Sequence, residues 1–191
     1  MIGPSLQQSA PFYFALHIIS GHVLLPLLTA TFLLSNRVKR HPTVVNFCVT
    51  WVIYSVSYSL YLYGGQRRSV EGLRELCMAQ LSMIYGSNAM VAAANLTLAI
   101  QIWSTFYVPW APLRTSQYGR CIRLVVLLAP PYIIFIAFSV IGLHEAQVHS
   151  QSINIDNGVY CAMDLQNFNY VQLALYATGG LQHLVVGSLY I

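Results

Sequence analysis

The stretch LCMAQLSMIYGSNAMVAAANLTLAIQIW, residues 76–103, contains no Asp, Glu, Lys or Arg. A helix needs about 20 apolar residues, each rising ~1.5 Å, to cross a hydrocarbon core, so this stretch is long enough to do so. Apolar runs such as HVLLPLLTATFLL, residues 22–34, also lack the alternating polarity of membrane β-strands. Because every backbone amide inside a bilayer needs a partner within the protein, such stretches predict transmembrane helices.

The composition of the whole chain agrees with this interpretation. Only 7% of the 191 residues are charged, 57% are hydrophobic, and the mean hydropathy is +0.60. A soluble domain carries roughly 25% charged residues, so lipid is expected to replace water over most of this surface. The fold class predicted is an all-α, polytopic membrane helix bundle forming one domain over residues 1–191. Its five predicted spans are residues 11–34, 43–64, 76–106, 122–143 and 170–191.

The connecting loops differ in charge. Those after the first and third predicted spans contain no acidic residue but carry six basic ones: Arg37, Lys39, Arg40, Arg114, Arg120 and Arg123. The other two connections contain three basic residues and all five acids. The positive-inside rule places the six-residue basic set in the cytoplasm and the amino terminus outside, although Arg67 and Arg68 then lie outside as well. We expect a multi-pass protein of the plasma membrane.

The chain stops at Ile191 within apolar sequence, and no basic residue follows the fifth predicted span. A final inward span is usually followed by cytoplasmic Lys or Arg. We therefore expect the sequence to be the front part of a longer protein, with a complete five-span protein as the alternative.

Two of the four cysteines lie on the predicted outer side. Cys77 is at the outer end of the third span, and Cys161 is in the long loop before the fifth. Disulfides persist in that compartment, and a bridge closing this 84-residue separation would contribute on the order of 4 kcal/mol in the chain-entropy model. The alternative is two unrelated free cysteines. We interpret Cys48 and Cys121 as packing residues, with lipidation of Cys121 as an alternative.

Two stretches resemble a known family. They are RHPTVVNFCVTWVIYSVSYSLYLYGGQ, residues 40–66, and the stretch 76–103 quoted above. Both are similar to the fungal, especially basidiomycete, seven-helix receptor-like proteins. The resemblance implies that five of seven helices are present, that an extracellular ligand is sensed, and that a heterotrimeric G protein is the partner. In animal rhodopsin-like receptors an acidic–Arg–aromatic triplet ends the third helix. Here the corresponding stretch is QIWSTFY, residues 101–107, so G-protein coupling is implied by the resemblance alone.

Polar residues inside the spans are candidates for ligand contact because burying them in lipid is costly. The third span contributes Gln80, Tyr85 and Asn88 in its outer half, and the second contributes Tyr58 and Tyr61. The alternative is that these side chains hydrogen-bond between helices, at roughly 0.6–2 kcal/mol each, or pack.

The sequence predicts neither a metal site nor a cofactor. His17 and His22 are five residues apart, about 500° of α-helical rotation, so they would not share a helix face. No HExxH, GxSxG, phosphate-loop or Cys-x-x-Cys motif occurs, so no enzymatic activity is expected. Nor is a nucleic-acid partner.

A receptor for an extracellular ligand is the leading functional hypothesis. The alternatives are a transporter or channel fragment and a structural membrane subunit. Ion-coupled transporters usually carry charged residues at mid-membrane, and these spans carry none.

Overall fold

The computed structural model describes residues 11–12, 14–35, 41–64, 70–106, 117–150, 153–154 and 161–163. Nearly all of them are helical: η1 (Ile18–Leu24, a π-helix), α2 (Leu25–Leu34), α3 (Pro42–Gly64), α4 (Val70–Phe106) and α6 (Gln117–Val148). By length and composition, four continuous helices in this part of the chain can cross a membrane: Phe14–Leu34, Pro42–Gly64, Gly72–Ser104 and Cys121–Val148. They correspond to the first four predicted spans. The fifth, residues 170–191, lies outside the described residues.

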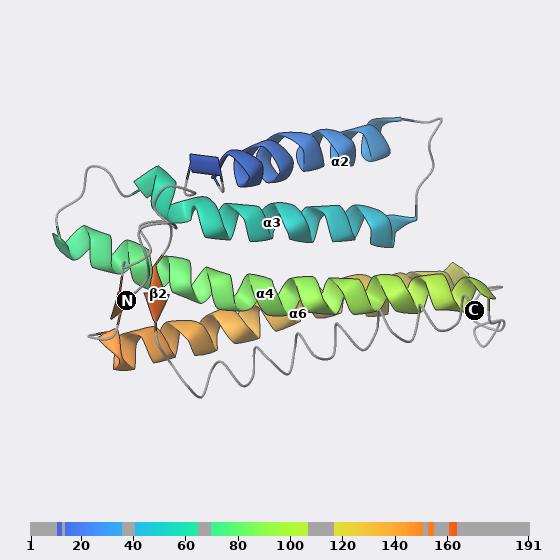
Figure 1. The fold of residues 1–191 in the computed structure, drawn as a ribbon. Coiled ribbons are helices and arrows are strands. Elements are labelled where there is room, and N and C mark those ends of the chain that lie inside the picture. Colours follow the sequence, from blue (N-terminus) through green and yellow to red (C-terminus); the bar gives the residue numbers. More distant parts are fainter. Residues whose placement is uncertain are drawn as a thin grey trace, which may run out of the picture.

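The helices lie side by side with roughly parallel axes (Figure 1). Helix α3 packs between α2 and α4, while α6 runs along α4 and also meets α3. Successive helices therefore form an up-and-down bundle in which α4 is central.

The distribution of polarity is the reverse of that in a soluble protein. The side chains of Leu27, Leu33, Val125, Ile133 and Val140 are between 61% and 68% exposed. Five polar side chains are fully buried, at 0% exposure: Thr50, Ser57, Ser59, Gln80 and Ser87. Apolar side chains facing outward and polar ones facing inward are what a lipid solvent requires, so the fold supports an integral membrane protein.

The first span changes its helical geometry at a proline. Pro26 has no N–H, and its ring would clash with the carbonyl four residues earlier, that of His22, in a regular α-helix. The chain is π-helical from Ile18 to Leu24 and becomes α-helical at Leu25. The wider turn places Gly21 directly against Ser55 of α3, with no room for a Cβ atom. Pro26 thus accounts for a local widening that sets how η1 docks on α3.

Helices α4 and α6 approach closely through small residues. A Cβ atom on Gly86 would lie 2.7 Å from the Phe135 carbonyl oxygen, and one on Gly142 would lie 3.0 Å from the Tyr85 ring. The Ser82 hydroxyl donates a 2.7 Å hydrogen bond to the Ser139 carbonyl. Such contacts stabilise helix pairs in lipid, where packing and hydrogen bonds replace the hydrophobic effect.

The helices extend beyond the charge-free stretches from which the spans were predicted. Helix α4 begins at Val70, so Cys77 lies two turns inside it. Helix α6 begins at Gln117, which puts Arg120 and Arg123 on a helix instead of in a loop. A charge-free stretch measures the length available to cross the hydrocarbon, and a helix can continue into water beyond it. The segment after α6 contains a short antiparallel pair, β1 (Ile153–Asn154) with β2 (Ala162–Met163), so the described fold is almost, but not wholly, helical.

Candidate functional site

A disulfide joins helix α4 to the segment between α6 and β2. Cys77 and Cys161 are bonded, with their Cα atoms 5.4 Å apart, and the bridge confirms the predicted pairing. The alternative of two free cysteines is therefore wrong. Cys48 is a buried free cysteine and Cys121 an exposed one.

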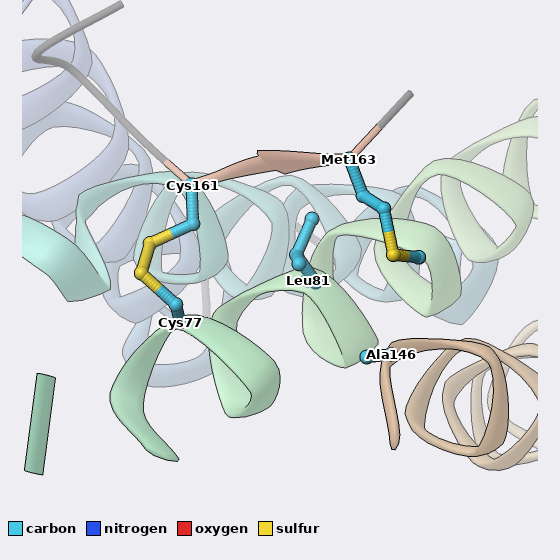
Figure 2. Packing of buried hydrophobic residues seen from close by; sticks show 5 residues of the cluster. All are labelled: Cys77, Leu81, Ala146, Cys161 and Met163. Atoms are coloured by element: carbon cyan, nitrogen blue, oxygen red, sulfur yellow. A yellow bond between two sulfur atoms is a disulfide. The ribbon is translucent and has the colours of Figure 1, made fainter. Parts of the chain in front are cut away.

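The segment that carries Cys161 also packs by hydrophobic contact. Cys161 and Met163 form a buried cluster with Leu81 of α4 and Ala146 of α6 (Figure 2). Two further predicted ligand residues, Tyr61 and Tyr85, pack against this cluster while remaining partly buried. Strand β2 therefore packs against α4 and the last part of α6, next to both tyrosines.

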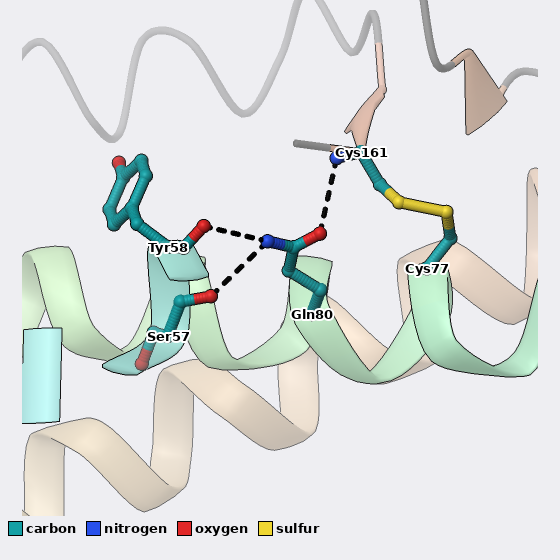
Figure 3. Close-up of a disulfide and its surroundings, with 5 residues drawn as sticks. All are labelled: Ser57, Tyr58, Cys77, Gln80 and Cys161. Carbon is teal, nitrogen blue, oxygen red and sulfur yellow. Dashed lines mark hydrogen bonds between the residues drawn. A yellow bond between two sulfur atoms is a disulfide. The ribbon is translucent and has the colours of Figure 1, made fainter. Parts of the chain in front are cut away.

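Gln80 joins three segments through one amide group. Its Nε2 donates to the backbone carbonyls of Ser57, at 3.3 Å, and Tyr58, at 3.1 Å. Its Oε1 accepts the N–H of Cys161 at 3.2 Å (Figure 3). Both amide protons are used, and the side chain is fully buried. Gln80 thus holds α3, α4 and the segment that carries Cys161 together beside the disulfide.

Asn88, two turns further along α4, is only partly satisfied. Its Oδ1 accepts a 3.3 Å hydrogen bond from the Tyr58 hydroxyl. Its Nδ2 is buried and has no hydrogen-bond partner in the structure described. An unpaired amide in an apolar environment costs several kcal/mol, so this group is a donor that can receive an acceptor.

A second polar cluster lies where η1 meets α3. The Ser55 hydroxyl donates to the His17 carbonyl at 3.0 Å and lies 3.3 Å from Nδ1 of His22. The His17 ring packs edge-on to Tyr58, with centroids 5.9 Å apart. The Nε2 atom of His22 is buried without a partner among the described residues. Together with Tyr58 and Asn88, these residues form a polar path across η1, α3 and α4.

The five candidate ligand residues all lie in one half of the α3–α4 helix pair. Their contacts form two groups. Tyr58 and Asn88 bond to each other, Gln80 bonds the Tyr58 backbone, and Tyr61 and Tyr85 contact the cluster under β2.

Sequence reasoning missed the histidine–serine cluster. It assumed 3.6 residues per turn, whereas the π-helical turn brings the backbone carbonyl of His17 and the ring of His22 to the same serine hydroxyl. Pro26, four residues after His22, was the available signal for an irregular turn. Within the described ranges, no three His, Cys, Asp or Glu side chains are grouped so as to hold a metal ion.

Near the opposite end of α4 lies Arg123 of α6, the one residue of the predicted basic set whose side chain is described. The Nη2 group of Arg123 donates to Gln101 Oε1 at 3.0 Å and to Ser104 Oγ at 2.6 Å. Arg37, Lys39, Arg40 and Arg114 lie outside the described residues, and only the backbone of Arg120 is described.

No family model matches the chain, and neither a curated protein nor a solved structure matches it. Its own residues and their contacts are therefore the basis for the function proposed below.

Proposed function

We propose that the protein is a multi-pass receptor of the plasma membrane that senses an extracellular ligand and signals to the cytoplasm through a heterotrimeric G protein. In this proposal the amino terminus is outside, and the chain supplies five of seven helices. The observation that carries the proposal is Asn88. Its buried, unpaired Nδ2 is a hydrogen-bond donor on a membrane helix, near the outer loop that the disulfide tethers. A ligand that accepts this hydrogen bond offsets the cost of burying the amide.

The proposed mechanism is a shift between two arrangements of the bundle. Asn88 already holds Tyr58 of α3, so a ligand acceptor on its amide changes how α3 sits on α4. Tyr58 also contacts the His17 ring, which extends the effect to the first span. A ligand that binds one arrangement better than the other shifts the population toward it.

The decisive experiment compares two asparagines of α4. The full-length protein is expressed with a G-protein reporter and exposed to a panel of peptides, sterols, sugars and volatile compounds. Asn88→Leu is expected to weaken the response to a compound that activates the wild type by up to about tenfold, the worth of one ligand hydrogen bond. Asn95→Leu, the same change seven residues further along the helix, is expected to leave the response within about twofold, because the unpaired buried donor is on Asn88.

Two results would contradict this proposal. One is an Asn88→Leu variant that responds like the wild type to an activating compound. The other is an amino-terminal epitope that antibodies reach only in permeabilised cells, which would reverse the orientation. Compound flux across sealed vesicles without nucleotide exchange would favour a transporter instead.

A further inference from the structure

Arg123 is a half-buried cation, and no acidic side chain among the described residues pairs with it. Residues 1–70 and 76–144 contain no Asp or Glu, so no carboxylate of neighbouring sequence can neutralise it. The acceptors that it does use, Gln101 Oε1 and Ser104 Oγ, are neutral and share one guanidinium nitrogen, Nη2. A guanidinium has five N–H donors, so three remain for an acceptor from outside the described residues.

The first turn of α3 lies at the same end of the bundle as this guanidinium. Nδ1 of His41 is 2.8 Å from Thr43 Oγ1 and accepts the Thr43 backbone N–H at 3.4 Å. Burial, and second the charge of Arg123, lower the pKa of His41. Tyr132 of α6 also donates a 2.6 Å hydrogen bond to Asn46 of α3, so the first turns of the two helices lie at the same end of the bundle. This end of the bundle therefore combines a fixed cation with the positive end of a helix dipole.

Exposed apolar side chains flank the same cluster on both helices. On α4, Ile100 and Trp103 are 38% and 46% exposed, and on α6, Ile122 and Val126 are 42% and 56% exposed. Ile100 and Trp103 neighbour Gln101 and Ser104 in sequence, while Ile122 and Val126 lie next to Arg123 and one turn beyond it. A polar anion site bordered by apolar ridges matches a molecule with an anionic head and hydrocarbon tails. An acidic peptide would bind the guanidinium but would leave these exposed apolar side chains uncovered.

We propose that Arg123, held by Gln101 and Ser104, binds the phosphate of an anionic phospholipid headgroup. The acyl chains of that lipid lie along the exposed apolar residues of α4 and α6. This site is separate from the proposed ligand site at Asn88 and does not depend on it. A basic residue near a membrane surface contributes about 1 kcal/mol toward an anionic lipid, which corresponds to roughly a fivefold preference.

The test uses Trp103 as a local probe. The full chain carrying Trp51→Phe and Trp110→Phe is placed in nanodiscs that contain either brominated phosphatidylserine or brominated phosphatidylcholine at equal mole fraction. Bromine quenches nearby tryptophan, so the serine lipid is expected to be enriched at Trp103 by about fivefold over the choline lipid. Arg123→Met is expected to remove this preference. Arg74→Met, an exposed arginine at the other end of α4, is the matched control and is expected to retain it.

Equal quenching by the two lipids, or a preference that survives in Arg123→Met, would overturn the proposal. Loss of the preference on adding millimolar inorganic phosphate would assign the site to a free anion. Loss on adding an acidic peptide would assign it to a protein partner, and either result overturns the lipid assignment. Because Arg123→Met could disturb folding, each variant is also tested for an intact Cys77–Cys161 bridge on non-reducing gels. Arg123→Lys, which keeps the charge, is expected to retain part of the preference.

Discussion

The two ends of α4 are each marked by a glutamine, and the two glutamines are held in different ways. Gln80 and Gln101 are 21 residues apart, about 31 Å of helix, which is close to the thickness of a hydrocarbon core. Gln80 is fully buried and bonds only to backbone atoms, beside a disulfide. Gln101 is 9% exposed and accepts a hydrogen bond from a charged, half-buried arginine.

The charges around the two ends differ as well. Near the Gln80 end, Glu145 of α6 and His149, just after that helix, form a pair at 3.4 Å, and the charged residues Arg74 and Glu75 are exposed. Near the Gln101 end the sequence supplies cations only. A covalent bond and buried hydrogen bonds therefore fix the Gln80 end of the bundle. The other end is held by a guanidinium whose bonds compete with water, ions and headgroups. Conformational change is therefore expected to cost least at the Gln101 end.

The largest effect on stability is expected from removing the disulfide at the Gln80 end of the bundle. Cys161→Ser should lower the free energy of unfolding by about 4 kcal/mol, because it releases an 84-residue loop in the unfolded chain. Denaturant titration of the purified protein in mild detergent measures this. Reducing agent should destabilise the wild type by the same amount and leave Cys161→Ser unaffected. The control Cys121→Ser removes an exposed free thiol and should change little. A wild type insensitive to reduction would show that the bridge does not hold this end.

A smaller loss of folding stability is expected when Gln80 is replaced by Met, which has nearly the same volume. The change removes three hydrogen bonds and leaves the buried N–H of Cys161 unpaired, at a cost of about 2 kcal/mol. The same titration measures it, with the exposed Gln147→Met as the matched control. Equal stability of Gln80→Met and Gln147→Met would show that the Gln80 hydrogen bonds do not stabilise the contact between the three segments.

The smallest effect on stability is expected at the Gln101 end of the bundle, and it depends on pH. Because the folded protein lowers the pKa of His41 below 6.5, folding disfavours the charged ring. The contribution of the neutral ring to stability is fully present above pH 6.5 and is lost as the pH falls through the lower folded value. His41→Asn can still cap α3 but does not titrate. The melting temperature of the wild type should therefore fall more between pH 7.5 and 5 than that of the variant. Parallel curves for the two proteins would contradict this assignment.

Much of the architecture could be predicted from the sequence because hydropathy is a local property. The absence of charge over residues 76–103 is sufficient to predict the α4 crossing, and the charged residues on either side limit the membrane segment. The pairing of Cys77 with Cys161 could be predicted because topology left each only one partner on its side. The extension of α4 back to Val70 could not, since helices continue into water without an apolar signal.

The candidate site was predicted only in part. Residue type and predicted depth in the membrane indicated Tyr58, Gln80 and Asn88 as ligand candidates, and the structure joins them across α3 and α4. Their roles depend on which atoms meet. Gln80 is satisfied at both ends of its amide, whereas Asn88 keeps one unpaired nitrogen, and nothing in the sequence distinguishes the two amides.

By itself, then, the sequence determined that the chain forms helices long and apolar enough to cross a membrane, and it located the four that the structure describes, because apolar length is a local property of the sequence. Only the tertiary structure decided how each helix is rotated against its neighbours. That rotation sets Ser55 against His17, Ser82 against Ser139 and Arg123 against Gln101. Each of these contacts joins residues distant in sequence, and their spacing depends on close helix approach and on a π-helical turn that no hydropathy pattern encodes.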